Sequence, residues 1–173
     1  MDIPPVVVFD LDGTLWNPEM YELFGGGGAP FTKLSRSELA DRRDTRVKLL
    51  GDVPAVLDLL DECHSTTVAI ASRTDEPAWA EECMEKLTMK SGRSLSSLFR
   101  IKEIYKGCKK GHLQEISRKS GIPLSEMLFF DNERGNVNDA ISLGVPSVYC
   151  PHGVTKAVWE NGLSNWRKAT RKQ

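Results

Sequence analysis

A short run of β-branched and aromatic residues near the start of the chain ends in two carboxylates. Residues 6–9 read Val-Val-Val-Phe, Asp10 and Asp12 follow, and Gly13 comes next. A run so short and so rich in β-branched residues is typical of a strand buried on both faces. Residues two apart on an extended strand point the same way, so we expect Asp10 and Asp12 to project together. Because adjacent carboxylates repel each other, a bound cation is the simplest way to stabilise the pair.

From residue 52 onward the chain alternates between helical and extended patterns. Apolar spacing predicts helices over residues 54–64, 77–87, 110–120, 136–143 and 154–161, and strands over 67–71, 98–105, 127–130 and 147–150. Alternation of this kind predicts a parallel sheet covered by helices on both faces. At 173 residues we expect one domain with an α/β fold, a Rossmann-like three-layer αβα doubly wound parallel sheet.

Residues 16–51 fit no clean periodicity. They include four consecutive glycines, at 25–28, and then a charged segment at 36–46. The glycines could form a phosphate-binding loop, but no strand precedes them and no Lys-Ser/Thr follows, so we expect a flexible loop tip. A structureless loop of this length is unusual in a compact domain. We therefore expect residues 16–51 to form a β-hairpin flap over the site, with no cap domain.

Polar residues follow two further predicted strands, at the edge of the sheet where ligands bind in open parallel sheets. Ser72 and Arg73 follow the strand over 67–71, and Asp131 follows the strand over 127–130. A hydroxyl and a guanidinium can both bind phosphate oxygens. The carboxylate of Asp131 can supply the hard oxygen that Mg²⁺ prefers. We therefore expect these residues to meet Asp10 and Asp12 at one rim of the sheet.

A lysine is expected at the same rim. Two anions about 4 Å apart repel by roughly 4 kcal/mol at an effective dielectric constant near 20, so bare carboxylates would reject a phosphate dianion. Lys106, Lys109 and Lys110 are the candidates, in a segment just before a predicted helix. Physical chemistry alone does not choose among the three.

The hexapeptide at residues 10–15, Asp-Leu-Asp-Gly-Thr-Leu, resembles the signature motif of the haloacid dehalogenase superfamily. Its members are mostly phosphatases that act through an aspartyl-phosphate. With the segments 41–43, 71–74 and 107–133, nearly the whole chain resembles the capless magnesium-dependent phosphatases of this superfamily. These are described as protein-tyrosine or sugar-phosphate phosphatases, so the resemblance implies phosphotyrosine on a protein or small sugar phosphates as substrates.

The resemblance also implies a role for each matched residue. Asp10 corresponds to the nucleophile and Asp12 to the general acid/base, and Gly107-Cys108-Lys109 matches the family's Gly-Ser-Lys, which selects Lys109. The implied substrate contacts are Leu11 through its N–H, Asp12, Ser72, Arg73 and Lys109, and the implied Mg²⁺ ligands are Asp10, Asp12 and Asp131.

The chain departs from the family at three places. It has Asp131-Asn132 where the family usually has two aspartates, so the outer metal shell is expected to carry one charge less. The glycines at 25–28 and the residues before Asp52 also differ from the family pattern. These departures bear on substrate preference more than on the reaction.

Other readings predict a different chemistry. A receiver domain also combines a doubly wound sheet with a phosphorylatable Asp, Mg²⁺ and a lysine, but there the lysine comes last, whereas Asp131 follows the lysines here. A carboxy-terminal-domain-type serine phosphatase usually carries DxDxT with a second threonine in place of the DGT. A catalytically inactive phosphate-binding regulatory domain is a third alternative, although every expected catalytic position is occupied.

The remaining expectations come from composition. With 23 basic and 24 acidic side chains, the charge does not indicate a nucleic-acid or membrane partner. Apolar stretches fall short of the roughly 20 residues that span a bilayer. The four cysteines form no CxxC pair, and no charged-then-apolar leader precedes the first strand, so we expect reduced thiols and a cytoplasmic protein, with a nuclear pool allowed.

Overall fold

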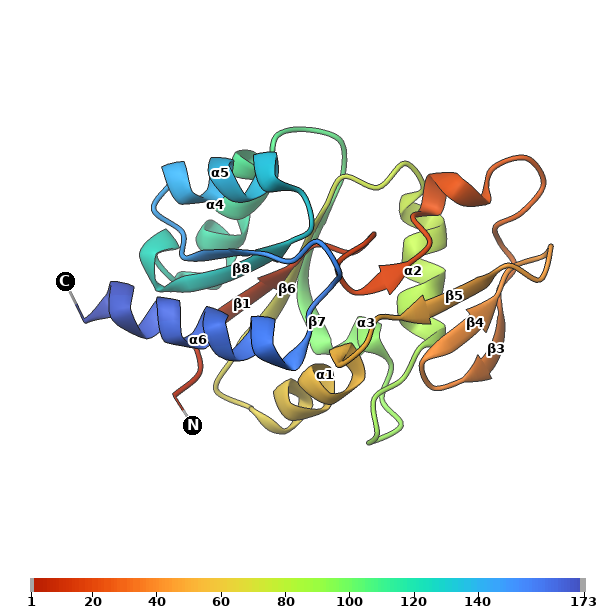
Figure 1. The fold of residues 1–173 in the computed structure, drawn as a ribbon, viewed down its shortest axis with the longest axis horizontal. Helices are drawn as coiled ribbons and strands as arrows, with labels where there is room; N and C mark the ends of the chain where they lie inside the picture. Colours follow the sequence, from red (N-terminus) through yellow and green to blue (C-terminus); the bar gives the residue numbers. More distant parts are fainter. Residues whose placement is uncertain (1, 172–173) are drawn as a thin grey trace.

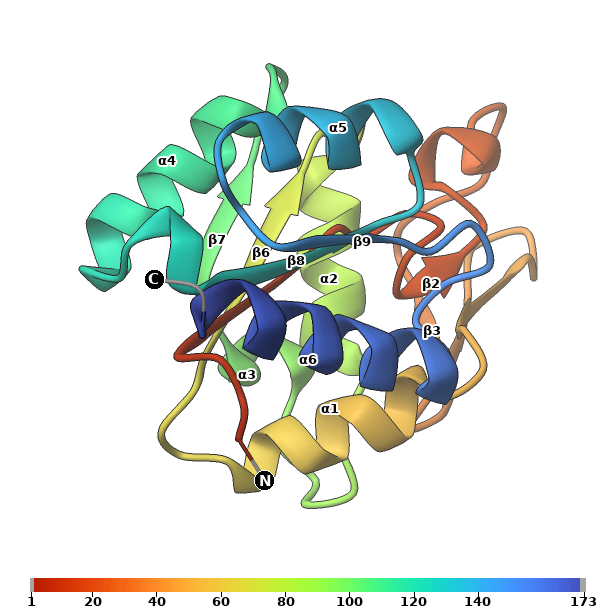
Figure 2. The ribbon, with the colours of Figure 1, turned by 60° about the vertical axis from the view of Figure 1, so that its left-hand side comes forward.

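The computed structural model describes residues 2–171 and contains a five-stranded parallel sheet between two layers of helices (Figure 1, Figure 2). The strand order is β7–β6–β1–β8–β9, so the sheet extends to both sides of the first strand. The strands are β1 (Val6–Phe9), β6 (Thr67–Ser72), β7 (Phe99–Ile104), β8 (Met127–Asp131) and β9 (Ser147–Tyr149). This arrangement confirms the predicted Rossmann-like α/β fold.

Helices cover both faces of this sheet. The helices are α1 (Val53–Glu62), α2 (Pro77–Lys86), α3 (Leu95–Leu98), α4 (Lys109–Ser120), α5 (Arg134–Ser142) and α6 (Lys156–Thr170), with a 3₁₀ turn η2 (Leu124–Glu126). α4 and α5 pack on one face, and α1, α2 and α6 share the core of the other (Figure 2). Within residues 2–171, no helix is both long and apolar enough to cross a bilayer.

The first strand shows why the sequence has an unbroken apolar run. Val7 and Phe9 belong to the core beneath α1, α2 and α6, whereas Val6 and Val8 belong to the core beneath α4 and α5. All four side chains are fully buried, and the Phe9 ring stacks on Phe130 of β8 with centroids 5.3 Å apart. A central strand buried on both faces has no position at which a polar residue would meet water.

Residues 16–49 form a second, smaller sheet beside the main one (Figure 1, right). Its strands are β2 (Trp16–Asn17), β3 (Thr32–Ser35), β4 (Glu38–Ala40) and β5 (Arg46–Leu49), in the order β2–β5–β4–β3, and the 3₁₀ helix η1 (Met20–Leu23) lies between β2 and β3. All three pairings are antiparallel. The predicted hairpin is therefore extended into a four-stranded flap.

The glycine-rich segment is anchored to the flap by a buried carboxylate. Asp41 accepts hydrogen bonds from the backbone N–H groups of Gly28, Arg43 and Thr45, at 2.8, 2.9 and 2.8 Å. Gly28 has a φ of +85°, and a Cβ there would lie 2.3 Å from the ring of Trp79. Only glycine fits such a position. The first two of the four glycines are exposed and the last two are buried, so the predicted loop tip describes only the first half.

Several predicted helix boundaries were wrong. α6 continues nine residues past its predicted end at 161, because Leu163 and Trp166 extend its buried stripe. Gly162 allows this packing, since a Cβ there would lie 2.7 Å from the ring of Phe130. α3 was not predicted, and α5 begins at Arg134 instead of residue 136. α3 is a single turn, too short to show a helical period.

Replacing Asp41 by alanine tests the anchoring of the flap. The change removes a charged acceptor from three backbone N–H groups, so we expect the free energy of unfolding to fall by about 2–4 kcal/mol. For a domain of this size that corresponds to a melting temperature lower by roughly 5–15 °C. Glu38→Ala, on β4 of the same flap, is the control and should change stability by less than about 0.5 kcal/mol. Equal melting temperatures for the two variants would show that Asp41 does not hold the flap.

Candidate active site

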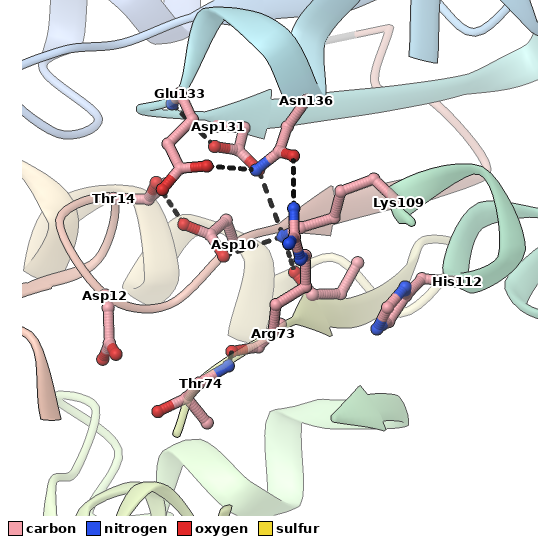
Figure 3. A network of polar contacts seen from close by, with 12 residues as sticks. Asp10, Asp12, Thr14, Arg73, Thr74, Lys109, His112, Asp131, Glu133 and Asn136 are labelled. Carbon is pink, nitrogen blue, oxygen red and sulfur yellow. Dashed lines mark hydrogen bonds and ion pairs between the residues drawn. The ribbon is translucent and has the colours of Figure 1, made fainter. Parts of the chain in front are cut away.

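Three charged side chains from distant parts of the sequence meet where β1 and β8 end (Figure 3). Asp10 follows β1, Asp131 is the last residue of β8, and Lys109 is the first residue of α4. The Lys109 Nζ lies 2.8 Å from Asp10 Oδ1 and 3.1 Å from Asp131 Oδ2. Lys109 is 1% exposed and also donates to the Ala71 carbonyl, so the ammonium is held on three sides. The site therefore contains a buried cation shared between two carboxylates.

The protonation of this group follows from its surroundings. Burial by itself would lower the pKa of Lys109, but Asp10 and Asp131 outweigh that effect and raise it. Burial raises the pKa of Asp131, and the nearby Asp10 carboxylate raises it further, while Lys109 opposes both. The lysine thus remains charged, and two carboxylates in a dry site compete for one cation.

Of the three lysines that the sequence left open, only Lys109 reaches this position. Lys106 pairs with Asp75 at the surface. Lys110 follows Lys109 in α4 and makes no ion pair within residues 2–171. The structure thus places in the site the lysine that the family resemblance selected.

Thr14 and Gly13 fix the orientation of Asp10. The buried Thr14 hydroxyl donates to Asp10 Oδ2 at 3.1 Å and accepts from the backbone N–H of Asn132 at 3.1 Å. Gly13 has a φ of +75°, and a Cβ there would overlap the side chain of Asn132. The glycine in the motif is therefore required by both its backbone conformation and its close neighbour.

Two oxygens of the first motif point toward the side chain of Asn132. Its amide is best oriented with the nitrogen inward, where it lies 3.0 Å from Asp10 Oδ2 and 3.1 Å from the backbone carbonyl oxygen of Asp12. The Asn132 amide holds these oxygens next to each other, and Asp131 shares Lys109 with Asp10, so the two carboxylates and the Asp12 carbonyl offer a hard oxygen set that suits Mg²⁺. Among residues 2–171, no three His, Cys, Asp or Glu side chains cluster closely enough to bind a metal by themselves. A metal here would also need the Asp12 carbonyl and water.

The alternation of a strand predicted that the carboxylates of Asp10 and Asp12 project together. In the structure they do not (Figure 3). Asp12 Oδ1 accepts from the Trp16 indole N–H at 2.9 Å, and Asp12 Oδ2 accepts from the Met20 backbone N–H at 3.1 Å. The reason is that β1 ends before Asp10 and the chain turns at Leu11, whose carbonyl accepts the N–H groups three and four residues later. Burial raises the pKa of Asp12, and the Trp16 and Met20 hydrogen bonds partly oppose the rise.

Four of the five predicted substrate contacts, all except Leu11, line one cavity. Ser72 is buried, and its hydroxyl accepts from the Thr74 N–H at 3.2 Å, while Arg73 is exposed at the rim. The backbone N–H groups of Leu11 and Asp12 donate to no acceptor within residues 2–171; Asp12 lines the cavity, whereas Leu11 is buried outside its lining. One cavity of about 180 Å³ is lined by Asp10, Asp12, Ser72, Arg73 and Lys109, with Asp131 fully buried below it.

An asparagine that the sequence did not single out connects the two sides of this cavity. The Asn136 amide nitrogen donates to Asp131 Oδ2 and to Glu133 Oε2, both at 3.1 Å, and its oxygen lies 3.4 Å from the Arg73 guanidinium. A helix predicted to begin at residue 136 gave no reason to place this side chain in the site. The start of α5 at Arg134 places it there.

His112 is a second residue that the sequence analysis missed. It is fully buried, and its ring nitrogens lie 3.0 Å from the Cys108 carbonyl and 2.8 Å from the Tyr105 carbonyl. Its ring also stacks on that of Tyr105, with centroids 4.3 Å apart. His112 therefore holds the loop from which Lys109 enters the site. In the sequence, His112 could have been found only from its position in the first turn of the helix predicted just after Lys109.

Comparison with known proteins agrees with this geometry. The chain matches the family model described as Acid Phosphatase over residues 2–169. It is 36% identical over 170 residues to the human protein named magnesium-dependent phosphatase 1, covering 96% of this chain and 89% of that protein. It is 33% identical over 141 residues to a HAD-like hydrolase superfamily protein of Schizosaccharomyces pombe, covering 79% and 80% of the two chains.

Solved structures share the fold at lower sequence identity. A haloacid dehalogenase-like family hydrolase from Xanthomonas campestris superposes with a TM-score of 0.64 at 15% identity, over 96% of this chain and 97% of that one. A HAD-superfamily hydrolase from Ehrlichia chaffeensis gives 0.63 at 14% identity, over 96% and 98%. The family match over nearly the whole chain decides the assignment. The chain belongs to the acid phosphatase family and is a phosphatase of the haloacid dehalogenase superfamily.

Proposed function

We propose that this phosphatase is a magnesium-dependent phosphomonoester hydrolase that forms an aspartyl-phosphate on Asp10. The observation that carries the proposal is the buried Lys109 ammonium, which bridges Asp10 and Asp131 at the floor of an open cavity. A fixed cation beside a carboxylate lowers the repulsion between that carboxylate and an incoming phosphate dianion. The relative named magnesium-dependent phosphatase 1 supports the same assignment.

In the first half-reaction, an oxygen of Asp10 forms a bond to phosphorus as the bond from phosphorus to the leaving oxygen breaks. Asp12 gives its proton to that leaving oxygen, and the alcohol departs. Burial raises the pKa of Asp12, which increases the protonated fraction that this step requires. Arg73 and Ser72 line the space in which the phosphoryl oxygens would be bound. The N–H of Leu11, which has no acceptor within residues 2–171, is the backbone donor that we propose for the same oxygens.

In the second half-reaction, the Asp12 carboxylate takes a proton from a water molecule, whose oxygen attacks the phosphorus of the aspartyl-phosphate. The bond between phosphorus and the Asp10 oxygen breaks, inorganic phosphate leaves, and both aspartates return to their starting states. Trp16 and Met20 hold the Asp12 carboxylate throughout the resting structure, so its position does not depend on the substrate.

Mg²⁺ would be held by the carboxylates of Asp10 and Asp131 and by the backbone carbonyl of Asp12. When bound, it supplies positive charge that stabilises the phosphoryl oxygens in the transition state. The ligand set is supported by two observations: the Asp10 carboxylate and the Asp12 carbonyl lie beside the same Asn132 amide, and Asp131 shares Lys109 with Asp10. Asn132 is neutral, so it adds no charge to the ion's surroundings.

The resemblance to capless family members favours phosphotyrosine on a protein or small sugar phosphates as substrates. The cavity is open at the flap, where the half-exposed ring of Tyr21 lines it.

Replacing the nucleophile tests the central assignment. Asp10→Asn keeps the shape of the side chain but removes its nucleophilic charge, so we expect kcat for p-nitrophenyl phosphate with Mg²⁺ to fall by at least ~10³-fold. Circular dichroism and melting temperature check that the variant is folded. Asp44→Asn, at an exposed turn of the flap, should retain full turnover. Turnover of Asp10→Asn at the wild-type rate would reject the mechanism, and a wild-type protein without turnover would favour an inactive phosphate-binding domain.

Replacing Asp12 separates the two half-reactions. p-Nitrophenolate leaves without help from an acid, so Asp12→Asn should still form the aspartyl-phosphate but should not hydrolyse it. Rapid mixing should show a burst of about one equivalent of p-nitrophenol followed by a slow phase. Mass spectrometry of the quenched protein should find one phosphoryl group on the peptide that contains Asp10. A phosphoryl group on another residue would identify a different nucleophile.

Removing the metal tests the proposed ligands. A chelator should lower kcat by at least ~10²-fold, and added Mg²⁺ should restore it. Independently of activity, Mg²⁺ should raise the melting temperature of the wild-type protein, since a ligand that binds only the folded state stabilises it. Asp131→Asn should lose this thermal response. Glu62→Gln, at the end of α1, should keep it. An equal Mg²⁺ response in Asp131→Asn would place the ion elsewhere.

A further inference from the structure

The mouth of the cavity is lined by acidic side chains that the proposed chemistry does not use. Glu19 comes from the flap just before η1, Asp75 from the loop between β6 and α2, and Glu133 from the loop between β8 and α5. They enter the cavity from three separate parts of the chain. The alcohol part of a substrate bound at Asp10 would have to pass between them.

Two of these three carboxylates have no compensating charge. Asp75 pairs with Lys106, so that pair is neutral overall. Glu19 and Glu133 form no ion pair within residues 2–171. Among the described residues, the Glu133 carboxylate accepts a side-chain hydrogen bond only from the neutral Asn136 amide. Both side chains retain contact with solvent and line the cavity, so a group that enters the mouth can reach them.

The basic side chains of the cavity lie beside the position at which the phosphoryl group would bind. Lys109 is buried between Asp10 and Asp131 and cannot reach the mouth. Arg73 is the remaining basic side chain that lines the cavity, and it points to Asn136 beside the phosphate position. With these cations occupied by a phosphate dianion, the charge left at the mouth is that of Glu19 and Glu133.

We infer, on the basis of the proposed function, that the site selects phosphomonoesters whose alcohol part carries an ammonium group and rejects those that carry a second anionic group. Opposite charges a few ångströms apart attract and like charges repel in a cleft that is only partly open to water. A mouth of this kind admits neutral alcohols without discrimination. The carboxylates of Glu19 and Glu133 thus determine specificity and take no part in bond making.

Three phosphomonoesters with two-carbon alcohol parts test the inference: phosphoethanolamine, 2-hydroxyethyl phosphate and phosphoglycolate. Their inhibition constants are measured in competition with p-nitrophenyl phosphate, so that the ranking does not depend on whether each is hydrolysed. We expect phosphoethanolamine to bind about 10-fold more tightly than the neutral ester and phosphoglycolate about 10-fold more weakly, since a single close charge pair is worth about one such factor. Sodium chloride at high concentration should compress the ranking because it screens exposed charges.

Variants that remove the charge of Glu19 or Glu133 test whether these side chains cause the difference in inhibitor binding. Glu19→Gln should reduce the ratio of the two charged inhibitors by about 3- to 10-fold, and the double variant Glu19→Gln/Glu133→Gln should reduce it further. Glu62→Gln removes the same charge from the far end of α1 and should leave the ratio unchanged. The ratio is compared within each variant, so a general loss of activity or stability does not alter it.

The outcomes separate this inference from the proposed function. If p-nitrophenyl phosphate is hydrolysed through Asp10 but the three esters bind equally well, the inference is overturned and the hydrolase assignment stands. If phosphoglycolate binds most tightly, the mouth favours an anionic alcohol part and the inference is also overturned. If p-nitrophenyl phosphate is not hydrolysed at all, the proposed function fails. Calorimetric titration then still measures the relative affinities of the same three esters, which tests the inference by itself.

Discussion

The structure depends on one buried ammonium group. Lys109 lies between Asp10 and Asp131 with 1% of its surface exposed, and a lone charge in that position would be strongly unfavourable. Its two carboxylates and the Ala71 carbonyl compensate the loss of water: Asp10 directly follows β1, Ala71 lies in β6 and Asp131 ends β8. The ion pairs therefore require β1, β6, β8 and the start of α4 to meet in one arrangement. Removing one partner would leave the others buried and uncompensated.

Much of the fold and part of the site could be predicted because a parallel sheet constrains its sequence tightly. Central strands are buried on both faces, so they appear as apolar runs such as 6–9 and 127–130, and ligand-binding residues follow at their carboxyl ends. This reasoning placed Asp10, Ser72 and Asp131 together. It could not choose Lys109 over its neighbours, because the direction of a side chain at a helix start depends on the preceding turn. The family resemblance made that choice.

The remaining features depend on contacts that no local pattern reports. The orientation of Asp12 follows from a turn directly after β1 and from a hydrogen bond to Trp16, which looks like an ordinary core residue in the sequence. Asn136 enters the site only because α5 begins at Arg134. The glycine segment is held by Asp41, which contributes a charged acceptor from a later part of the flap. In each case a polar group forms its hydrogen bond with a residue whose position cannot be inferred from the spacing of apolar residues in the sequence.

The anchoring of Asp12 has a consequence for how this enzyme can diverge. Both donors to its carboxylate, Trp16 and Met20, belong to the segment that also shapes the entrance of the cavity. The flap is therefore not an interchangeable module, since grafting one from a relative would displace the carboxylate that we propose as the proton donor together with the entrance of the cavity. Glu19 and Tyr21 flank the Met20 anchor and line the cavity without bonding to Asp12, so a substitution at either position can alter the entrance while the hydrogen bonds that hold Asp12 are kept.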